Sequence, residues 1–563
     1  MGGIDRRMFL QTTAGLVGAV ALGACSKSTP QAPVALRLTD NPARGAGELP
    51  PTARVVLRAA GEDAGLPSPF GYAFPPGYFT MMYIYDSLLW TDSTGRLVPW
   101  LASDFKRSAD GLTFTFVLRD NLRWHDGKLL TPDDVVFTFE YFAAQRATLP
   151  PVLLFKPEHV ANVRATGPTT VEFRLDKPAA TFPEQVAGRV PIIPRHIWST
   201  IKDPSAVQDL KLLVGSGPYR LDNYAAGAGA YLFVANDDFF LGRPYFKRLE
   251  FFPVGDDLAA LRADKIDVTE VSTGAFAGEL APFTQDQKFA IISGPPNLLF
   301  ALYWNLGRGG ALGDVRFRQA CAHAINRADM VERILGGNGE VGNPGFLPEG
   351  HPFRVPVEQY PFDPARAEEM LDAAGYRRSG GSKSTRQAPD GSPLRFDLLA
   401  DPVTADAASA VSNQLAAVGV RLDVQPSDFI FPKLAKGEFQ TALLLFGGQA
   451  GDPDLMRLVY SSRVDKGFEA VRGYVNAELD DLADQQLVTL DETERKRLVG
   501  RMQEIVASDL PALHLYYPTD FLIYRKAAFD QWSLGRAHLG PFNKQVLLTG
   551  VAGGGVAIRP VTD

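Results

Sequence analysis

Residues 95–142 read GRLVPWLASDFKRSADGLTFTFVLRDNLRWHDGKLLTPDDVVFTFEYF and contain the clearest local signals in the chain. Apolar and polar residues alternate over 112–118 after an Asp-Gly turn, which predicts a hairpin strand. Thr131 suits a helix N-cap, and Asp133 and Asp134 follow at the positive end of the helix dipole. The two aspartates are therefore interpreted as capping groups of a helix rather than as a catalytic pair.

Further sequence blocks follow along the rest of the chain. They are IYDSLLW (84–90), VPIIPRHIW (190–198), VGSGPYRL (214–221), LYWNL (302–306), DVRFRQACAHAINRADMVERIL (314–335), FDPARAEEMLDAAGY (362–376), QLAAVGVRLDVQ (414–425) and LAKGEFQTALLLFGG (434–448). Taken in this order, the blocks resemble the bacterial extracellular solute-binding proteins of family 5, the dipeptide, oligopeptide and nickel receptors of ABC importers. The resemblance runs from about residue 53 to about residue 525.

The resemblance implies an α/β fold of the two-lobed periplasmic-binding-protein type (type II), in its large class with an extra subdomain and with mixed sheets flanked by helices. It places the first lobe at residues 53–298 and 515–563, with a subdomain inserted at about 85–190, and the second lobe at 299–514. The apolar run 512–517 is assigned to a strand that returns the chain to the first lobe. In such receptors the ligand lies between the lobes, which close around it.

The second half of the chain supports an α/β fold on its own residues. A strand at 394–399 precedes a helix at 405–418 that ends at Gly419, and residues 420–425 then alternate between apolar and polar. The apolar run 439–446 suits a buried strand. Strand, helix and strand in this order predict a partly parallel sheet.

Composition sets the broad class of the protein. The chain of 563 residues is 45% hydrophobic and 21% charged, which is ordinary for a multidomain globular protein. Its net charge of −7 offers no basic field for a phosphate backbone, so nucleic acid is not an expected partner. Its two cysteines, Cys25 and Cys321, are too few for a disulfide scaffold or a structural zinc site.

The first residues have the anatomy of an export signal. Residues 1–24 combine a charged start with an apolar stretch, and Arg6 and Arg7 before a Phe-Leu pair resemble the twin-arginine export motif. Cys25 ends the run LGAC, which resembles the lipobox of bacterial lipoproteins. Residues 25–52 are rich in proline and small residues and are interpreted as a tether behind a lipidated cysteine. The expected location is the extracytoplasmic face of the bacterial membrane or the periplasm, with a lipid anchor.

The sequence shows no catalytic signature. It contains no HExxH, CxxC, GxSxG or phosphate-loop motif, and its seven histidines are scattered. We therefore expect neither an enzyme, nor a metal site, nor a cofactor. Cys321 lies on the apolar face of a helix behind Asp314, which favours a buried structural thiol.

Candidate ligand residues come from two parts of the chain. Tyr78 and Phe79 lie in an aromatic segment rich in proline, where a loop is expected, and they could either pack in the core or wall a ligand pocket. Trp304 is a further stacking candidate. In peptide-binding relatives an aspartate binds the peptide's α-amino group, and the position that matches it by the resemblance is Gln449. Asp452, three residues later, could bind ligand or cap the turn at Pro453.

These observations together favour a binding function. We expect a monomeric, lipid-anchored receptor that delivers a small peptide-like or other polar solute to an ABC permease and ATPase complex. An extracellular sensor or chaperone on the same scaffold is the alternative, and a secreted hydrolase is the least favoured because no nucleophile and base are found.

Overall fold

The computed structural model describes residues 55–548, except residues 74, 93–96, 150–159, 272–276, 382–383, 428–429, 450, 465–469, 530–531 and 533–543. The predicted signal peptide, with Arg6 and Arg7, and the tether, with Cys25, lie outside the described residues. Within the described residues, no helix is long and apolar enough to span a membrane.

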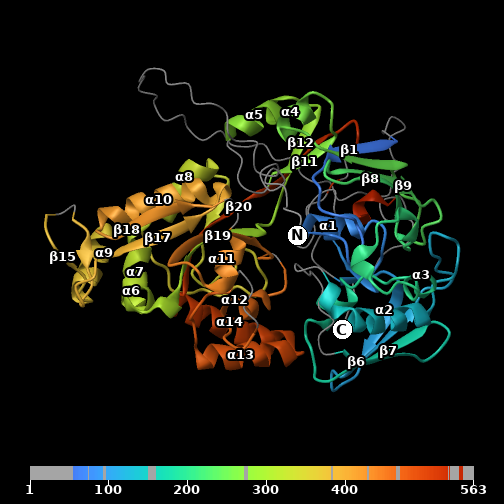
Figure 1. Cartoon of the computed structure of the whole chain (residues 1–563), viewed down its shortest axis with the longest axis horizontal. Helices are drawn as coiled ribbons and strands as arrows, with labels where there is room; N and C mark the ends of the chain where they lie inside the picture. Colours follow the sequence, from blue (N-terminus) through green and yellow to red (C-terminus); the bar gives the residue numbers. More distant parts are fainter. Residues whose placement is uncertain are drawn as a thin grey trace.

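A mixed sheet of seven strands forms the base of one body, which we call the first lobe (Figure 1). Its order is β12-β21-β11-β1-β10-β9-β8. The strands are β1 Val56–Ala60, β8 Tyr219–Ala225, β9 Ala230–Ala235, β10 Arg248–Phe252, β11 Val268–Val271, β12 Phe289–Gly294 and β21 Asp520–Arg525. Strand β1 pairs in parallel with β10 and β11, and the other pairs in this sheet are antiparallel. Helices α4 (Asp257–Arg262) and α5 (Ala277–Gln285) lie at its β11–β12 end.

A second, antiparallel sheet of four strands belongs to the same lobe. Its order is β4-β5-β7-β6, with β4 Ala102–Arg107, β5 Thr113–Leu118, β6 Val160–Ala165 and β7 Thr170–Leu175. Helix α2 (Pro132–Ala144) packs against β6 and β7. The predicted hairpin strand is β5, and the predicted cap is confirmed, since the backbone N–H of Thr131 donates to the Asp134 carboxylate at 2.9 Å.

The other body, which we call the second lobe, is built on a six-stranded sheet. Its order is β14-β20-β13-β19-β17-β18, with β13 Leu298–Trp304, β14 Gly339–Val341, β17 Arg395–Ala400, β18 Arg421–Pro426, β19 Thr441–Gly447 and β20 Ala512–Pro518. Strand β17 pairs in parallel with β18 and β19, as the βαβ pattern predicted. The α/β fold with mixed sheets is therefore confirmed.

Helices cover both faces of the second lobe's sheet. One face carries α7 (Val315–Ala324), α8 (Arg327–Leu335), α9 (Pro364–Ala373) and α10 (Ala405–Ala417), and the other carries α12 (Leu455–Tyr460), α13 (Ala477–Val488) and α14 (Glu492–Asp509). Strand β13 is apolar on both sides because Phe300, Leu302 and Trp304 face the first group while the residues between them face the second.

The remaining elements are short. They are α1 Pro75–Met81, β2 Leu89–Thr91, β3 Leu97–Pro99, the π-helical turn η3 Phe182–Ala187, α3 Arg195–Trp198, α6 Gly310–Gly313, β15 Arg377–Arg378, β16 Arg386–Gln387 and α11 Phe431–Lys436.

The chain passes between the lobes twice, at residues 295–297 between β12 and β13 and at residues 518–519 between β20 and β21. The prediction that the run 512–517 returns the chain to the first lobe is wrong. This run is β20, which pairs with β13 and β14 in the second lobe, and the returning strand is β21. Only Thr519 lies between the two strands, and Pro518, at which the apolar run ends in the sequence, marks the change of sheet.

Lys544, from the C-terminal part of the chain, packs into the core of the first lobe. The ammonium of Lys544 is fully buried, donates to the carbonyl oxygen of Tyr85 at 2.9 Å and pairs with Asp86 at 2.6 Å. It also lies 4.7 Å from the centre of the Trp90 ring. Burial lowers the pKa of Lys544, and the Asp86 carboxylate opposes that shift. The first lobe is thus assembled from residues at both ends of the chain.

Candidate ligand-binding site

The aromatic pair of the predicted site lies on helix α1 of the first lobe. The prediction of a loop for Tyr78 and Phe79 is wrong, because Pro75 and Pro76 occupy the first two helical positions, where a missing N–H costs nothing. The two rings meet edge to face at 5.5 Å. Tyr78 is buried and its hydroxyl donates to the carbonyl oxygen of Arg189 at 2.9 Å, and burial raises its pKa.

Arg189 connects this pair to an acid of the same lobe. Its guanidinium contacts the carboxylate of Glu184 at 3.1 Å, and both side chains are about one quarter exposed. Glu184 lies in η3, a π-helical turn of the kind that often occurs at functional sites. Burial raises the pKa of Glu184, Arg189 opposes that shift, and the charges of Asp452 and Arg495 of the second lobe act on it as well.

The second lobe contributes the turn that follows strand β19. Gln449 is buried there. Its side-chain amide nitrogen, when it faces two backbone carbonyl groups, donates to the carbonyl oxygen of Asn297 at 2.7 Å and to that of Phe446 at 3.1 Å. The backbone N–H of Gly448 also donates to the carbonyl oxygen of Asn297, at 3.0 Å. Since Asn297 lies in the crossing between the lobes, the Gln449 amide contacts the interlobe connection itself.

Asp452 of the same turn forms a buried ion pair. Its carboxylate binds two nitrogens of Arg495 at 2.6 and 2.8 Å and also accepts the backbone N–H of Asp454 at 2.8 Å, so the turn-capping role is present beside the ion pair. Burial would raise the pKa of Asp452, but the Arg495 guanidinium and the Asp454 N–H outweigh it and hold the pKa below its usual value. Arg495 also donates to Gln486 and lies 5.5 Å from the centre of the Phe353 ring.

The structure brings four of the five candidate residues toward one region. Tyr78 and Phe79 reach Glu184 through Arg189, and Glu184 interacts across the lobe junction with the turn that carries Asp452 and Gln449. Trp304 does not belong to this region. It is fully buried in the core of the second lobe, and its ring packs against Phe317.

Sequence reasoning missed three charged residues of this region, Glu184, Arg189 and Arg495. The charged run 492–497, which contains Arg495, predicts a solvated helix face. That interpretation fails for Arg495, which is buried, while its neighbours Lys496 and Arg497 are exposed. A single buried arginine in a charged run leaves no signal in the sequence, because its partner Asp452 lies 43 residues away.

The four charges of this region form one ion pair in each lobe. Each of the two acids has an arginine of its own, so the four charges are matched in pairs. Asp454, the next acid along the turn, binds Arg457 at 2.7 Å. Among the described residues, no group of histidine, cysteine, aspartate and glutamate side chains has the arrangement of a metal site. Cys321 is buried, as predicted, and burial raises the pKa of its thiol.

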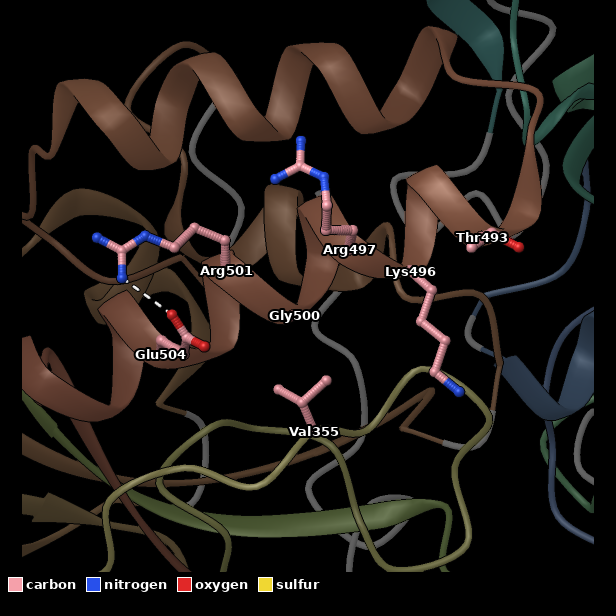
Figure 2. A pocket seen from close by; sticks show the side chains of 7 residues that line it. All are labelled: Val355, Thr493, Lys496, Arg497, Gly500, Arg501 and Glu504. Carbon is pink, nitrogen blue, oxygen red and sulfur yellow. Dashed lines mark hydrogen bonds and ion pairs between the residues drawn. The ribbon is translucent and has the colours of Figure 1, made fainter.

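A groove of about 460 Å³ lies on the exposed side of α14, apart from this region. Figure 2 shows Lys496 extending from the helix toward the loop that carries Val355, which lies opposite Gly500. Arg497 pairs with Glu494 and Arg501 with Glu478 and Glu504 along its rim. None of the five candidate ligand residues of the sequence lines this groove.

Comparisons with a family model and with known proteins point to the same family. Residues 96–467 match the family model described as "Bacterial extracellular solute-binding proteins, family 5 Middle". The oligopeptide-binding protein AppA of Bacillus subtilis is 25% identical over 465 residues, which cover 78% of this chain and 81% of that protein.

Solved structures share the fold. The structure of Bacillus subtilis AppA in complex with a nonapeptide superposes with a TM-score of 0.68 at 24% identity, covering 84% of this chain and 94% of that one. NikA from Brucella suis in complex with Fe(III)-EDTA superposes with a TM-score of 0.72 at 21% identity, covering 84% and 95%. A nonapeptide and a metal chelate are thus both bound by proteins of this architecture.

Proposed function

The chain belongs to the bacterial extracellular solute-binding proteins of family 5, and on that premise we propose that it is the extracytoplasmic receptor that delivers a small polar solute to an ABC importer. The observation that carries the proposal is the match of residues 96–467 to the family model, on a fold whose two lobes face each other and touch where the Ala180 N–H donates to Leu487. Native mass spectrometry of the purified protein with its retained solute tests it. A bound small molecule is expected, and turnover of that molecule by the protein would contradict a receptor.

We further propose that the solute is not an ordinary peptide with a free amino terminus. By the resemblance, Gln449 takes the position where peptide-binding relatives keep an aspartate, and its amide donates to Asn297 and Phe446. Asp452 and Glu184 are each matched by an arginine. A buried ammonium without a carboxylate partner is costly, so a neutral or differently charged peptide-like solute fits these residues better.

Calorimetric titration with a mixed peptide library, once with free and once with acetylated amino termini, tests this ligand class. We expect weak binding that acetylation does not change. Gln449→Asp should strengthen binding of the free peptides only, while Gln425→Asp, an exposed substitution on β18, should not. Tight binding that acetylation abolishes would assign the anchor to Asp452 and would remove Gln449 from its proposed role.

We propose that the protein is exported through Arg6 and Arg7 and anchored by a lipid on Cys25. Replacing both arginines with lysine should leave the precursor in the cytoplasm, and Cys25→Ala should release the protein from the membrane fraction. Arg37→Lys, in the proposed tether, is the matched control and should change neither. Unchanged membrane localisation of both variants would contradict the proposal.

The domain organisation is proposed to follow the two chain crossings. The first lobe then comprises the residues before 295–297 and those after 518–519, with residues 85–190 as its inserted subdomain, and the second lobe lies between. We propose a monomer, in which one chain supplies both walls of the site. Analytical ultracentrifugation at micromolar concentration checks this, and a stable dimer would contradict it.

A further inference from the structure

The lobes touch at a place far from the chain crossings. We call this contact the lip: it is formed by residues 108–111 and 178–189 of the first lobe and residues 484–495 of the second. Figure 1 shows α13 and α14 at the opposite end of the junction from β12 and β20. The lip therefore has to form and break whenever the lobes close and open.

A backbone hydrogen bond crosses the lip. The N–H of Ala180 donates to the carbonyl oxygen of Leu487 at 2.7 Å. Leu487 lies in the last turn of α13, where carbonyl groups have no partner within the helix. The first lobe thus satisfies a helix end of the second lobe, and opening would leave that carbonyl to water.

An apolar contact lies next to this bond. Leu490, in the link between α13 and α14, packs directly on Gly111 of the first lobe. A Cβ at Gly111 would lie 2.3 Å from the Cδ1 of Leu490 and 3.4 Å from the Cβ of Pro178. A side chain at position 111 would therefore force Leu490 to move, and the φ of +68° at Gly111 also suits glycine.

The charges near the lip are matched within each lobe. Glu184 and Arg189 approach from one lobe, and Asp452 and Arg495 from the other, which gives two acids and two bases. A set with no net charge does not need an ionic solute to make closure favourable. The chain thus supplies a hydrogen bond, an apolar contact and matched charges at one place.

We propose that the link between α13 and α14, with Leu487 and Leu490, is a latch that holds the lobes closed in the absence of ligand. A solute can then bind only after the latch contacts have broken and the lobes have opened. Because the latch contacts are the same with and without solute, weakening them raises the association and dissociation rates together and changes the affinity little while the closed form dominates. The proposal concerns the empty receptor and does not depend on which solute it carries.

Hydrogen exchange on the empty full-length protein tests the latch directly. The exchange rate of the Ala180 amide measures how often the lip opens. The Leu175 amide donates to Leu112 within the first lobe at 2.8 Å, so its exchange rate measures the stability of that lobe. We expect both amides to be protected in the unmodified protein after native mass spectrometry has shown it to be empty. Fast exchange at Ala180 beside slow exchange at Leu175 would overturn the proposal.

Two glycines provide a matched pair of variants. Gly111→Ala places a methyl group against Leu490, whereas Gly127→Ala, at a turn of the same lobe with φ of +83°, meets no atom within 4 Å. Both carry the strain of a left-handed alanine. We expect Gly111→Ala to accelerate exchange at Ala180 about tenfold relative to Gly127→Ala. Equal exchange at Ala180 in the two variants would overturn the latch.

Leu490→Ser gives an independent check without backbone strain, with Leu129→Ser, at an exposed leucine of the first lobe, as its control. Small-angle X-ray scattering of the empty proteins should show a larger radius of gyration for Leu490→Ser only. An unchanged radius in Leu490→Ser, or the same increase in both variants, would contradict the latch.

Discussion

The hinge and the lip join the same two lobes by different kinds of contact. At the hinge, the two chain crossings are bonded to each other, since the N–H of Asn297 donates to the buried carboxylate of Asp520 at 3.2 Å and Gln449 donates to Asn297. At the lip, the chain is not continuous, and the contact includes the Ala180–Leu487 hydrogen bond and the packing of Leu490 on Gly111.

This difference separates two properties of the receptor. Hinge contacts persist in the open and closed forms, so they contribute to folding and fix the path of the lobes. Lip contacts across the junction exist only in the closed form, so they set how often the lobes open. Substitutions in the two regions should therefore affect different measurements.

The largest effect is expected within the second lobe, directly beneath the lip. Asp452→Ala leaves the buried guanidinium of Arg495 without its carboxylate, which should lower the free energy of unfolding by about 3–5 kcal/mol. Asp484→Ala, which removes an exposed partner of Arg463, should cost less than about 1 kcal/mol. Urea unfolding monitored by tryptophan fluorescence measures both. Equal losses would mean that Arg495 finds other partners and that the pair does not anchor the lip.

Acid should weaken the fold through two histidines that lie away from the lip. Burial lowers the pKa of His125 in the first lobe and of His514 on β20 to about 4, from 6.5, although hydrogen bonds to backbone carbonyls of Gly217 and Asn343 oppose the shift. The unfolded chain binds the proton more tightly, so stability is complete above pH 6.5 and is lost as the pH falls toward 4, by up to about 3 kcal/mol for each histidine.

Glutamine variants separate the two contributions. His514→Gln should flatten the pH dependence of unfolding in the second lobe, and His125→Gln should do so in the first. Urea midpoints at pH 7 and pH 4.5 provide the comparison, with His323→Gln, near the exposed side of α7, as the control. A pH dependence that survives both substitutions would contradict this assignment.

A smaller effect is expected at the hinge. Asp520→Ala removes the acceptor of the Asn297 N–H, and an unsatisfied buried donor costs about 1–3 kcal/mol. Asp286→Ala removes an exposed acceptor of the Lys288 N–H and should change little. The loss for Asp520→Ala should appear in urea unfolding and not as selective exchange at Ala180. Selective exchange at Ala180 would show that the hinge also controls closure.

Local signals explain which elements the sequence could predict. Asp314 caps α7 and Asp363 caps α9 over two or three residues, within which a side-chain oxygen can reach the first free N–H groups. Gly419, with φ of +84°, ends α10 for an equally local reason. The parallel pairing of β17 with β18 follows from the helix between them.

The candidate site depended on contacts that no local pattern encodes. Trp304 and Tyr303 are adjacent aromatic residues on β13, and the period of two places them on opposite faces of the sheet. Arg495 is buried because of Asp452, a residue of a distant turn. The lip itself joins residues 180 and 487, so it appears only when the lobes are placed against each other.

The smallest expected effect concerns the pH dependence of the lip, and its sign is opposite to that of the fold. Burial raises the pKa of Glu184 above 4.5 in the closed form, and opening should return it toward that value because the second lobe no longer covers it. The closed form then binds the proton more tightly. Closure should gain stability as the pH falls through the raised pKa and level off below about 4.5.

Two neighbouring charges stay constant over this range, because Arg495 has a raised pKa and Asp452 has a lowered pKa. His351 is a further titratable neighbour of Asp452, and its ring nitrogen contacts the carbonyl oxygen of Gly451 at 2.9 Å. Exchange at Ala180, divided by exchange at Leu175 to remove the intrinsic pH effect, should therefore slow a few-fold in mild acid. Glu184→Gln should abolish this slowing and His351→Gln should preserve it. The reverse result would assign the pH dependence to His351 and leave Glu184 as a structural partner of Arg189.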